Sequence, residues 1–334
     1  MYMDTILLFL GLLLSFVMAI NIGGNDAANP TSTAVGSGAL SLRRALILFA
    51  IFVILGALLQ GYMVIKTIGK GIVPEIDILG AFIIVLSANI WIFFATMRGM
   101  AISTTHSIVA AVIGYGIARY FSEINLGVLT TIFISWITSP LLSALLSFFL
   151  YKLSYFLIKK YSLKSEKILR ILVIFTLLFS AYSFGANDVA NATGVYITIA
   201  CKLGQMPDFN AMILLSIYGA IGIIIGGYIL GPKVIRTLAF RITRLDLLMA
   251  LAAGLANATT VYLFTTLPYF IFGYGLPIST SYVAVGSILG VGGAKSSINM
   301  KITAKLISYW IMTIPFNIIL TFALYKLFTI FSIF

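Results

Sequence analysis

Long apolar runs alternate with short polar segments along nearly the whole chain. The apolar runs cover about residues 5–23, 45–65, 78–97, 126–157, 168–186, 210–231, 245–267 and 303–332. A helix needs roughly 20 apolar residues to cross a bilayer. The pattern therefore predicts an all-α chain that crosses a membrane many times.

Four shorter segments between these runs are rich in Gly, Ser, Thr and Asn. They lie at about residues 25–41, 98–118, 187–203 and 268–292. Such segments are too polar to face lipid, and irregular backbone at membrane depth is tolerated only where protein or a water-filled cavity surrounds it. We therefore expect all four to line a pathway through the protein.

The composition agrees with a multi-pass protein of the cell membrane. Of the 334 residues, 61% are hydrophobic and 9% are charged, whereas an ordinary soluble domain carries about 25% charged residues. The net charge of +12 resides in short loops between apolar runs. We interpret it as retention of those loops in the cytoplasm and not as nucleic-acid binding.

The polar segments occur twice in the same order, which predicts an internal duplication. The matched pairs are Gly24–Asn29 with Ala186–Asn191, Ala88-Asn89 with Ala256-Asn257, and Ala101–His106 with Pro277–Tyr282. We assign a first repeat to residues 1–151 and a second to 171–334, joined by a connector at 152–170. The connector carries the densest basic cluster, formed by Lys152, Lys159, Lys160, Lys164, Lys167 and Arg170.

The basic residues also suggest a topology. If residues 25–41 and 187–203 are re-entrant half-helices while 98–118 and 268–292 cross as broken helices, each half crosses five times, with about 12 membrane segments in all. The odd number inverts the second half relative to the first and leaves both termini outside. Sixteen of the 21 Lys and Arg residues then lie on the cytoplasmic side, as expected for a positive-inside protein.

Two aspartates, Asp26 and Asp188, lie far from any predicted membrane surface. A charged Asp at the bilayer centre costs roughly 2.5–3.5 kcal/mol, so such residues usually mark an ion or substrate path. Each could instead cap a helix. Both stand in an Asn-Asp-x-x-Asn frame, whose oxygens suit a small cation such as sodium, or the aspartates could carry protons. The cation-site candidates are Asn25, Asp26, Asn29, Asn187, Asp188 and Asn191.

Two hydroxyl-rich runs stand where a helix is expected to break and restart. A helix start offers free backbone amides and a partial positive charge, which bind phosphate, sulfate or carboxylate. The alternative is that the hydroxyls only pack helices together, but their duplication opposite the aspartates favours an anion site. The runs are Ser103, Thr104 and Thr105, and Ser279, Thr280 and Ser281.

Four further polar residues are candidates for accessory roles. Asn89 and Asn257 either bond between helices or line the site. His106 could handle protons, although a polar residue with satisfied hydrogen bonds is the favoured interpretation because Tyr282 takes the matched place. Arg98 could attract an anion, although its side chain is more typical of one that extends to the interface.

At the two Asn-Asp segments the chain resembles the inorganic phosphate transporters of the PiT type. Their signature is close to Gly-Ala-Asn-Asp-Val-Ala-Asn-Ala, and residues 23–30 and 185–192 follow it, with departures at Gly24 and Pro30. The later element, close to Pro-Val/Ile-Ser-Thr-Thr-His, resembles residues 101–106 and 277–282, with departures at Ser281 and Tyr282.

The resemblance implies a symporter with two inverted repeats that moves inorganic phosphate inward with sodium or protons. It also implies a homodimer in the lipid bilayer, no bound cofactor, no enzymatic activity, and a central site. The phosphate-binding candidates are Ser103, Thr104, Thr105, Ser279, Thr280, Ser281, Asn25, Asp26, Asn187 and Asp188.

Sulfate is the competing substrate, because a related branch of the family resembles sulfate permeases. Phosphate at neutral pH carries a proton that can be donated to a carboxylate, whereas sulfate only accepts hydrogen bonds. An aspartate that faces the anion therefore favours phosphate, and sodium is the favoured coupling ion. A passive anion channel is the remaining alternative.

Overall fold

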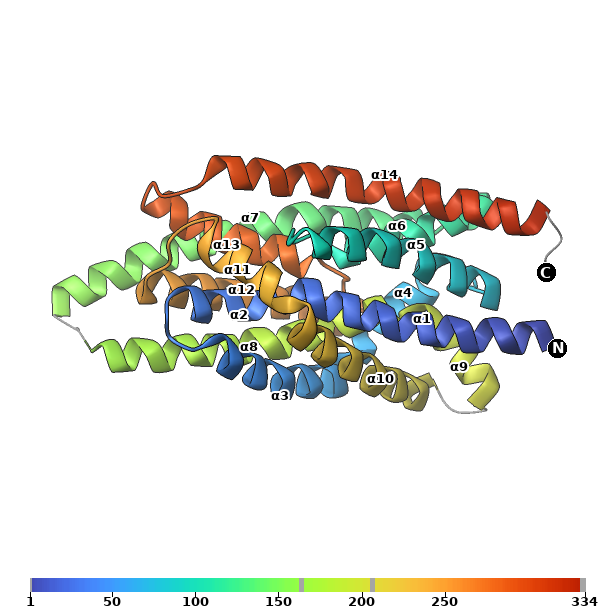
Figure 1. The fold of residues 1–334 in the computed structure, drawn as a ribbon, viewed down its shortest axis with the longest axis horizontal. Helices are drawn as coiled ribbons and strands as arrows, with labels where there is room; N and C mark the ends of the chain where they lie inside the picture. The colour runs from blue at the N-terminus through green and yellow to red at the C-terminus, as the bar shows by residue number, and fades with distance from the viewer. Residues whose placement is uncertain (1, 162–164, 205–207, 331–334) are drawn as a thin grey trace.

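The chain folds into a bundle of α-helices (Figure 1). The structure is a computed structural model that describes residues 2–161, 165–204 and 208–330, so Lys164 of the predicted connector lies outside the described residues. The helices are α1 (Tyr2–Asp26), α2 (Ala28–Gly36), α3 (Leu42–Gln60), α4 (Tyr62–Lys70), α5 (Ile78–Met97), α6 (Thr104–Arg119), α7 (Leu126–Tyr161), α8 (Glu166–Thr193), α9 (Ile197–Gly204), α10 (Asp208–Ile229), α11 (Gly231–Phe240), α12 (Leu247–Phe272), α13 (Thr280–Ala294) and α14 (Met300–Ile330), with 3₁₀ turns at Phe121–Glu123 and Gly194–Tyr196.

Among the described residues, eight helical segments are long and apolar enough to cross a membrane. Shorter helices such as α13 lie between them. Large apolar side chains such as Phe9, Leu141 and Ile311 are exposed on the outside of the bundle, as expected where lipid is the solvent. The predicted all-helical polytopic fold is therefore confirmed, with eight to about twelve membrane segments.

The two Asn-Asp segments lie within long crossings. Helices α1 and α2 form one apolar segment, Thr5–Gly36, and α8 with α9 forms another, Glu166–Cys201. The first is interrupted at Ala27, directly after Asp26. Pro30 explains the break, because it has no N–H to donate to the carbonyl of Asp26 four residues earlier.

The Ser/Thr segments instead form the tips of two hairpins. Helix α6 returns alongside α5, because an ion pair joins Asp77 at the start of α5 to Arg119 at the end of α6. Helix α13 returns alongside α12 in the same way, with Lys295 Nζ 2.6 Å from the carboxylate of Asp246. This hydrogen bond raises the pKa of Lys295 above its ordinary value.

Each hairpin turns at a glycine that follows its first arm. Gly99 has φ +67° and Gly273 has φ +78°. This left-handed region favours glycine, which ends a helix without a Cβ clash. In Figure 1 the two hairpins enter the bundle from opposite ends.

The expected assignment of crossings and re-entrant segments was therefore wrong. Residues 25–41 and 187–203 belong to crossings, whereas 98–118 and 268–292 belong to hairpins. Both arrangements surround polar backbone with protein, so polarity did not distinguish them.

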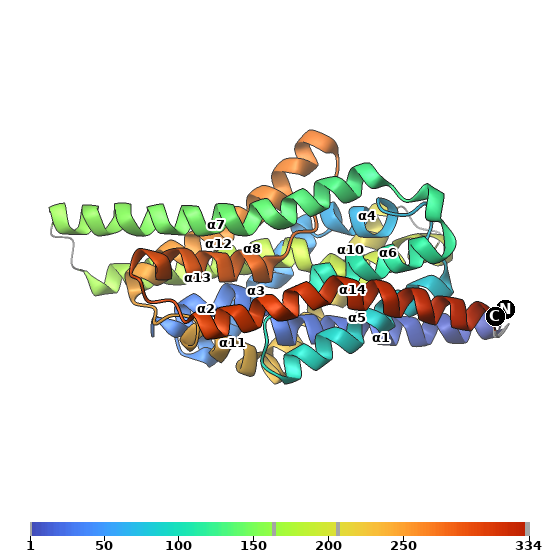
Figure 2. The ribbon, with the colours of Figure 1, turned by 90° about the horizontal axis from the view of Figure 1, so that it is seen from above.

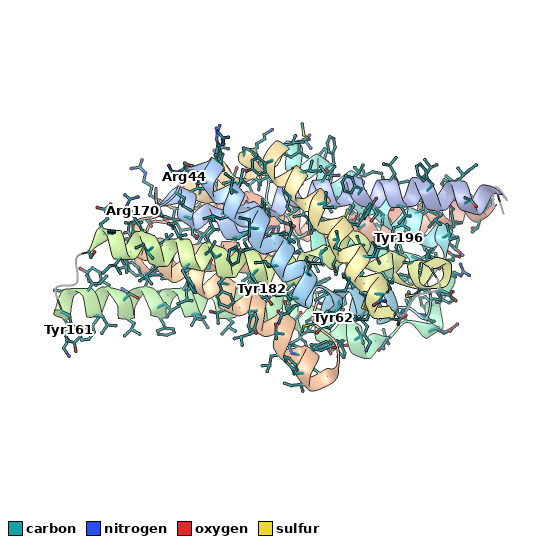
Figure 3. The ribbon with its side chains drawn as sticks, turned by 90° about the horizontal axis from the view of Figure 1, so that it is seen from below. Arg44, Tyr62, Tyr161, Arg170, Tyr182 and Tyr196 are labelled. Atoms are coloured by element: carbon teal, nitrogen blue, oxygen red, sulfur yellow. The ribbon has the colours of Figure 1, made fainter. Side chains whose placement is uncertain are left out.

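The two ends of the bundle differ in charge. The start of α1 and the end of α14 lie together at one end (Figures 1 and 2). The end of α7 and the start of α8 lie at the other end, where Arg44, Arg170 and Tyr161 are found (Figure 3). We call this the basic end.

Glycines let helices of the two halves approach closely. Helix α1 packs against α10, and α3 packs against α8. A Cβ on Gly23 would collide with the carbonyl of Ile223, and one on Gly226 with that of Ile20. Gly56 and Gly185 face carbonyls in the same reciprocal way across α3 and α8. Two equivalent interfaces thus join the halves.

We expect Gly226→Ala to destabilise the protein, because the added methyl group would push α10 away from α1. Overpacking of this kind costs about 1–3 kcal/mol. The melting temperature of the purified protein in detergent should fall by roughly 3–10 °C.

The matched control is Gly127→Ala, where the nearest atom to an added Cβ is 3.4 Å away. Its melting temperature should stay within about 2 °C of the wild type. Equal melting of Gly226→Ala and the control would contradict the proposed role of close helix contact.

Candidate functional site

The two hairpin tips meet the two Asn-Asp segments in the middle of the bundle. Ser103 caps α6, since its Oγ accepts from the backbone N–H of His106 at 3.0 Å. Ser279 caps α13 in the same way, accepting from the N–H of Tyr282 at 3.2 Å. The next two residues of each tip are buried, and their hydroxyls face the Asn-Asp segments.

Asp26 receives hydrogen bonds from both hairpins. Its Oδ2 accepts from Thr104 Oγ1 at 2.6 Å, and its Oδ1 accepts from Ser281 Oγ at 2.7 Å. The carboxylate is 1% exposed. One buried aspartate thus joins the hairpin of its own half to the hairpin of the other half.

The amides of the Asn-Asp-x-x-Asn frames cross between the halves reciprocally. Asn29 Nδ2 donates to Thr280 Oγ1 and Ser281 Oγ, both at 3.1 Å. Asn191 Nδ2 donates to Thr105 Oγ1 at 2.9 Å and lies 3.3 Å from Thr104 Oγ1. Each frame therefore contacts the hairpin tip of the opposite half.

Asp188 belongs to the same network. Its Oδ1 accepts from Asn191 Nδ2 at 2.7 Å and from Thr105 Oγ1 at 3.4 Å. Because Asn191 also reaches Thr104, which donates to Asp26, the two carboxylates are connected through two side chains. The predicted convergence of the two aspartates on hydroxyl-bearing helix starts is present in this structure.

Three oxygens on α8 are buried and accept no hydrogen bond from the residues that the structure describes. They are Asn187 Oδ1, Asp188 Oδ2 and Asn191 Oδ1. Buried acceptors ordinarily have a partner, and carboxylate and amide oxygens are the donors that small hard cations prefer. This donor set fits a sodium ion.

Asn25 and Asn187 hold the hairpin turns of their own halves. Asn25 Nδ2 donates to Thr96 Oγ1 and to the carbonyl of Met100, both at 2.9 Å. Asn187 Nδ2 donates to Thr265 Oγ1 at 2.7 Å and to the carbonyl of Leu276 at 2.9 Å. The amide groups of these asparagines thus donate to the arms and turns of the hairpins and not to the hydroxyls of the two Ser/Thr runs.

The accessory candidates Asn89 and Asn257 form hydrogen bonds between helices. Asn89 Oδ1 accepts from Asn21 Nδ2 at 2.7 Å, and Asn89 Nδ2 donates to the carbonyl of Leu14 at 3.0 Å. Asn257 Nδ2 donates to Ser180 Oγ at 2.7 Å and to the carbonyl of Asn29 at 3.1 Å. Asn257 therefore contacts a site residue, whereas Asn89 contacts α1 nearer its start.

His106 is buried among aromatic rings. Its ring centroid lies 3.7 Å from that of Trp136 and 4.5 Å from that of Tyr282. Both ring nitrogens lack hydrogen-bond partners within the described part of the chain. The packing among rings agrees with a structural role for His106, but the hydrogen bonds expected of a satisfied polar residue are absent among the described residues.

Two tryptophans at the hairpin tips were missed in the sequence. Trp136 Nε1 donates to the carbonyl of Pro277, and Trp310 Nε1 to that of Ala101, both at 3.0 Å. Trp310 stacks on Tyr282 at 3.8 Å, whereas Trp136 packs against His106 with the ring planes tilted by 46°. Each indole thus reaches the tip of the opposite half, and its similar distance after each Ser/Thr run was the available signal.

Arg98 stands apart from the network. Its guanidinium is exposed and lies 3.6 Å over the ring of Phe94. The residue follows α5 at the hairpin turn, next to Gly99. The structure does not bring it to the aspartates.

Known proteins with similar sequences and folds are membrane transporters. The sequence profile of the phosphate transporter family matches residues 22–321. A protein of Pyrococcus abyssi named as a phosphate permease is 30% identical, over 96% of this chain and 97% of its own length. The sulfate permease CysP of Bacillus subtilis is 32% identical, over 95% of this chain and 87% of its own length.

A solved structure has the same fold. It is described as the sodium-dependent phosphate transporter, and it aligns with a TM-score of 0.83 and 28% identity over 97% of this chain and 99% of the other. The profile match, the permease relatives and this common fold agree with the buried site. The chain therefore belongs to the phosphate transporter family, as a multi-pass membrane transporter and not an enzyme.

Proposed function

We propose that this chain imports inorganic phosphate together with sodium ions by alternating access. Its two halves act as inverted repeats, with both termini outside and the basic end in the cytoplasm. The observation that carries the proposal is the position of Asp26, which accepts hydrogen bonds from hydroxyl groups of both hairpins. Any movement of one hairpin relative to the other must rearrange this carboxylate.

The anion is held at the hairpin tips. The N-termini of α6 and α13 are directed into the site, and each offers backbone N–H groups and a partial positive charge. Thr104, Thr105, Thr280 and Ser281 add hydroxyl donors around the same position. Hydroxyls that now donate to carboxylates can turn to donate to phosphate oxygens. The aspartates can then accept a hydrogen bond from the protonated oxygen of phosphate.

The cations are held by the Asn-Asp segments. The three unpartnered oxygens of Asn187, Asp188 and Asn191 supply the hard ligands that sodium requires. The carbonyl of Asp26, which Pro30 leaves without its helical partner, is a further ligand of the same kind. Protons are the alternative coupling ion, carried by the same aspartates.

Sulfate is the second candidate substrate, because one relative is a sulfate permease. Sulfate has no proton to donate at neutral pH, so it would face the carboxylates of Asp26 and Asp188 without a compensating hydrogen bond. The unfavourable approach of two like charges therefore favours phosphate.

The test is uptake of labelled phosphate into proteoliposomes under separate sodium and pH gradients. We expect a sodium gradient to concentrate phosphate and tenfold excess sulfate to leave most of the uptake intact. Equilibration without accumulation would indicate an anion channel. Suppression of uptake by sulfate, together with uptake of labelled sulfate, would indicate a sulfate permease.

Asp188→Asn should abolish sodium-driven phosphate uptake, because the charge that balances the cation is lost. We expect a decrease of at least about 100-fold, equivalent to roughly 3 kcal/mol. The control is Asp208→Asn, since Asp208 is 56% exposed and contacts Lys70 and Cys201, away from the central site. The control should stay within about twofold of the wild type, and comparable uptake by both variants would contradict the cation role.

Thr104→Val should weaken phosphate uptake while the shape of the side chain is kept. Loss of a hydroxyl that bonds a charged group costs about 1.5–3 kcal/mol, so we expect the KM for phosphate to rise at least about tenfold. Thr138→Val removes an exposed hydroxyl that bonds only the carbonyl of Ile134. Equal KM values for the two variants, both monodisperse by gel filtration, would remove Thr104 from the site.

A further inference from the structure

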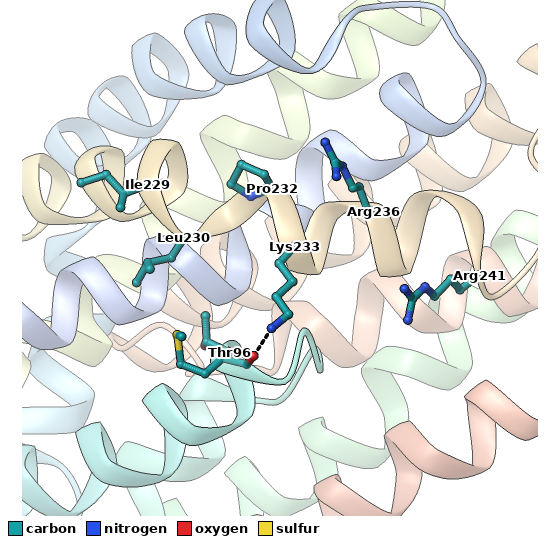
Figure 4. A pocket seen from close by; sticks show the side chains of 8 residues that line it. Thr96, Ile229, Leu230, Pro232, Lys233, Arg236 and Arg241 are labelled. Atoms are coloured by element: carbon teal, nitrogen blue, oxygen red, sulfur yellow. Dashed lines mark hydrogen bonds between the residues drawn. The ribbon is translucent and has the colours of Figure 1, made fainter.

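A cleft opens beside the first hairpin, between α11 and the end of α5. It has a volume of about 410 Å³, and Figure 4 shows its lining side chains. The lining residues are Thr96, Met97, Ile229, Leu230, Pro232, Lys233, Arg236 and Arg241. Both walls thus belong to segments that also position the central site.

The polar lining of this cleft is strongly basic. Lys233, Arg236 and Arg241 are exposed, and no lining residue is acidic. None of the three forms an ion pair with a carboxylate among the residues that the structure describes. Three unpaired cations around one cavity make it attractive to anions.

The cleft ends one hydrogen bond away from the central site. Thr96 lines the cleft and accepts the amide of Asn25 at 2.9 Å, and Asp26 is the next residue in the chain. Lys233 Nζ donates to the carbonyl of Met97, the last residue of α5 and also part of the lining (Figure 4). A single lysine therefore connects the basic wall of the cleft to the end of α5. We call this end, where the chain turns, the elbow of the first hairpin.

The other hairpin carries a matching contact. Lys66 Nζ on α4 lies 3.4 Å from the carbonyl of Gly273, which follows the last residue of α12. Each lysine thus bonds the C-terminal end of a hairpin arm from the opposite half of the chain. Helix C-termini carry a partial negative charge, which favours such a cation.

We propose that the α11 cleft is a second binding site for the transported oxyanion, located between the central site and the solution at the basic end. Lys233 exchanges the carbonyl of Met97 for the anion, and Arg236 and Arg241 complete the site. The release of Met97 frees the elbow of the first hairpin. This inference rests on the proposed phosphate transport.

The exchange follows from the strengths of the two interactions. A lysine bonds a neutral carbonyl more weakly than it bonds an anionic oxygen, because only the anion adds the attraction between two full charges. An oxyanion in the cleft therefore competes for Lys233, and the arginines present the fork geometry that suits phosphate. Occupancy of the cleft and opening of the hairpin elbow are thereby coupled.

The experiment measures the KM for phosphate from each side of the membrane. Right-side-out and inside-out vesicles expose the two ends of the transporter separately, and trypsin cleavage at the exposed Lys159 and Lys160 identifies the vesicles that present the basic end. The variants are Lys233→Gln and Arg236→Gln. The matched control is Lys305→Gln, an exposed lysine on α14 that does not line the cleft.

We expect both variants to raise the KM at the basic end by at least about fivefold, and to leave the KM at the opposite end within about twofold. The control should change neither value. Unchanged KM values, or an equal rise at both ends, would overturn the proposal. A wild-type protein that moves no phosphate would instead refute the proposed function itself.

Anionic lipid headgroups have the same phosphate chemistry, so the comparison is repeated in proteoliposomes of phosphatidylcholine with and without phosphatidylglycerol. A rise in KM that persists in phosphatidylcholine alone supports free phosphate as the ligand. A rise that appears only with phosphatidylglycerol means that lipid occupies the cleft, and overturns the proposal.

Discussion

The structure depends on solvating two buried carboxylates without water. An aspartate at the centre of a membrane costs several kcal/mol unless protein groups replace its hydration. Here the replacement comes from hydroxyls at the tips of two hairpins and from the amide of Asn191, which donates to Asp188. The hairpins must therefore end at the middle of the bundle, and helices α1 and α8 must pass beside those ends.

Each half of the chain completes the site of the other half. Asn29 contacts the second hairpin and Asn191 contacts the first. The indoles of Trp136 and Trp310 donate to the second and the first tip in the same reciprocal way. The glycine contacts of α1 with α10 and of α3 with α8 also join the two halves, through close packing of their backbones. Neither half can move alone without changing contacts at both tips, which is the coupling that alternating access requires.

The ends of the hairpins are secured by charge where the chain leaves the apolar interior. The pairs Asp77–Arg119 and Asp246–Lys295 join the bases, and each aspartate also caps the helix that it precedes. The tips are held by hydrogen bonds instead, from their hydroxyls to the carboxylate of Asp26 and from amides and indoles to their polar atoms. A fixed base and a hydrogen-bonded tip make the tip the part that ligands can rearrange.

The sequence by itself determined the class of protein and the residues that meet at the centre, and it predicted a duplication. Apolar runs of membrane length, two Asn-Asp frames and two hydroxyl runs are local patterns, and each is visible without knowing what packs against it.

Only the tertiary structure decided which polar segments cross and which turn back. Polarity shows that a segment must be surrounded by protein, but it does not give the direction of the chain after that segment. The same limit applies to Asn25 and Asn187, which bind the hairpin turns although they share a frame with the site residues. It applies equally to Lys233 and Trp136, because their partners lie more than 130 residues away along the chain and only packing brings them together.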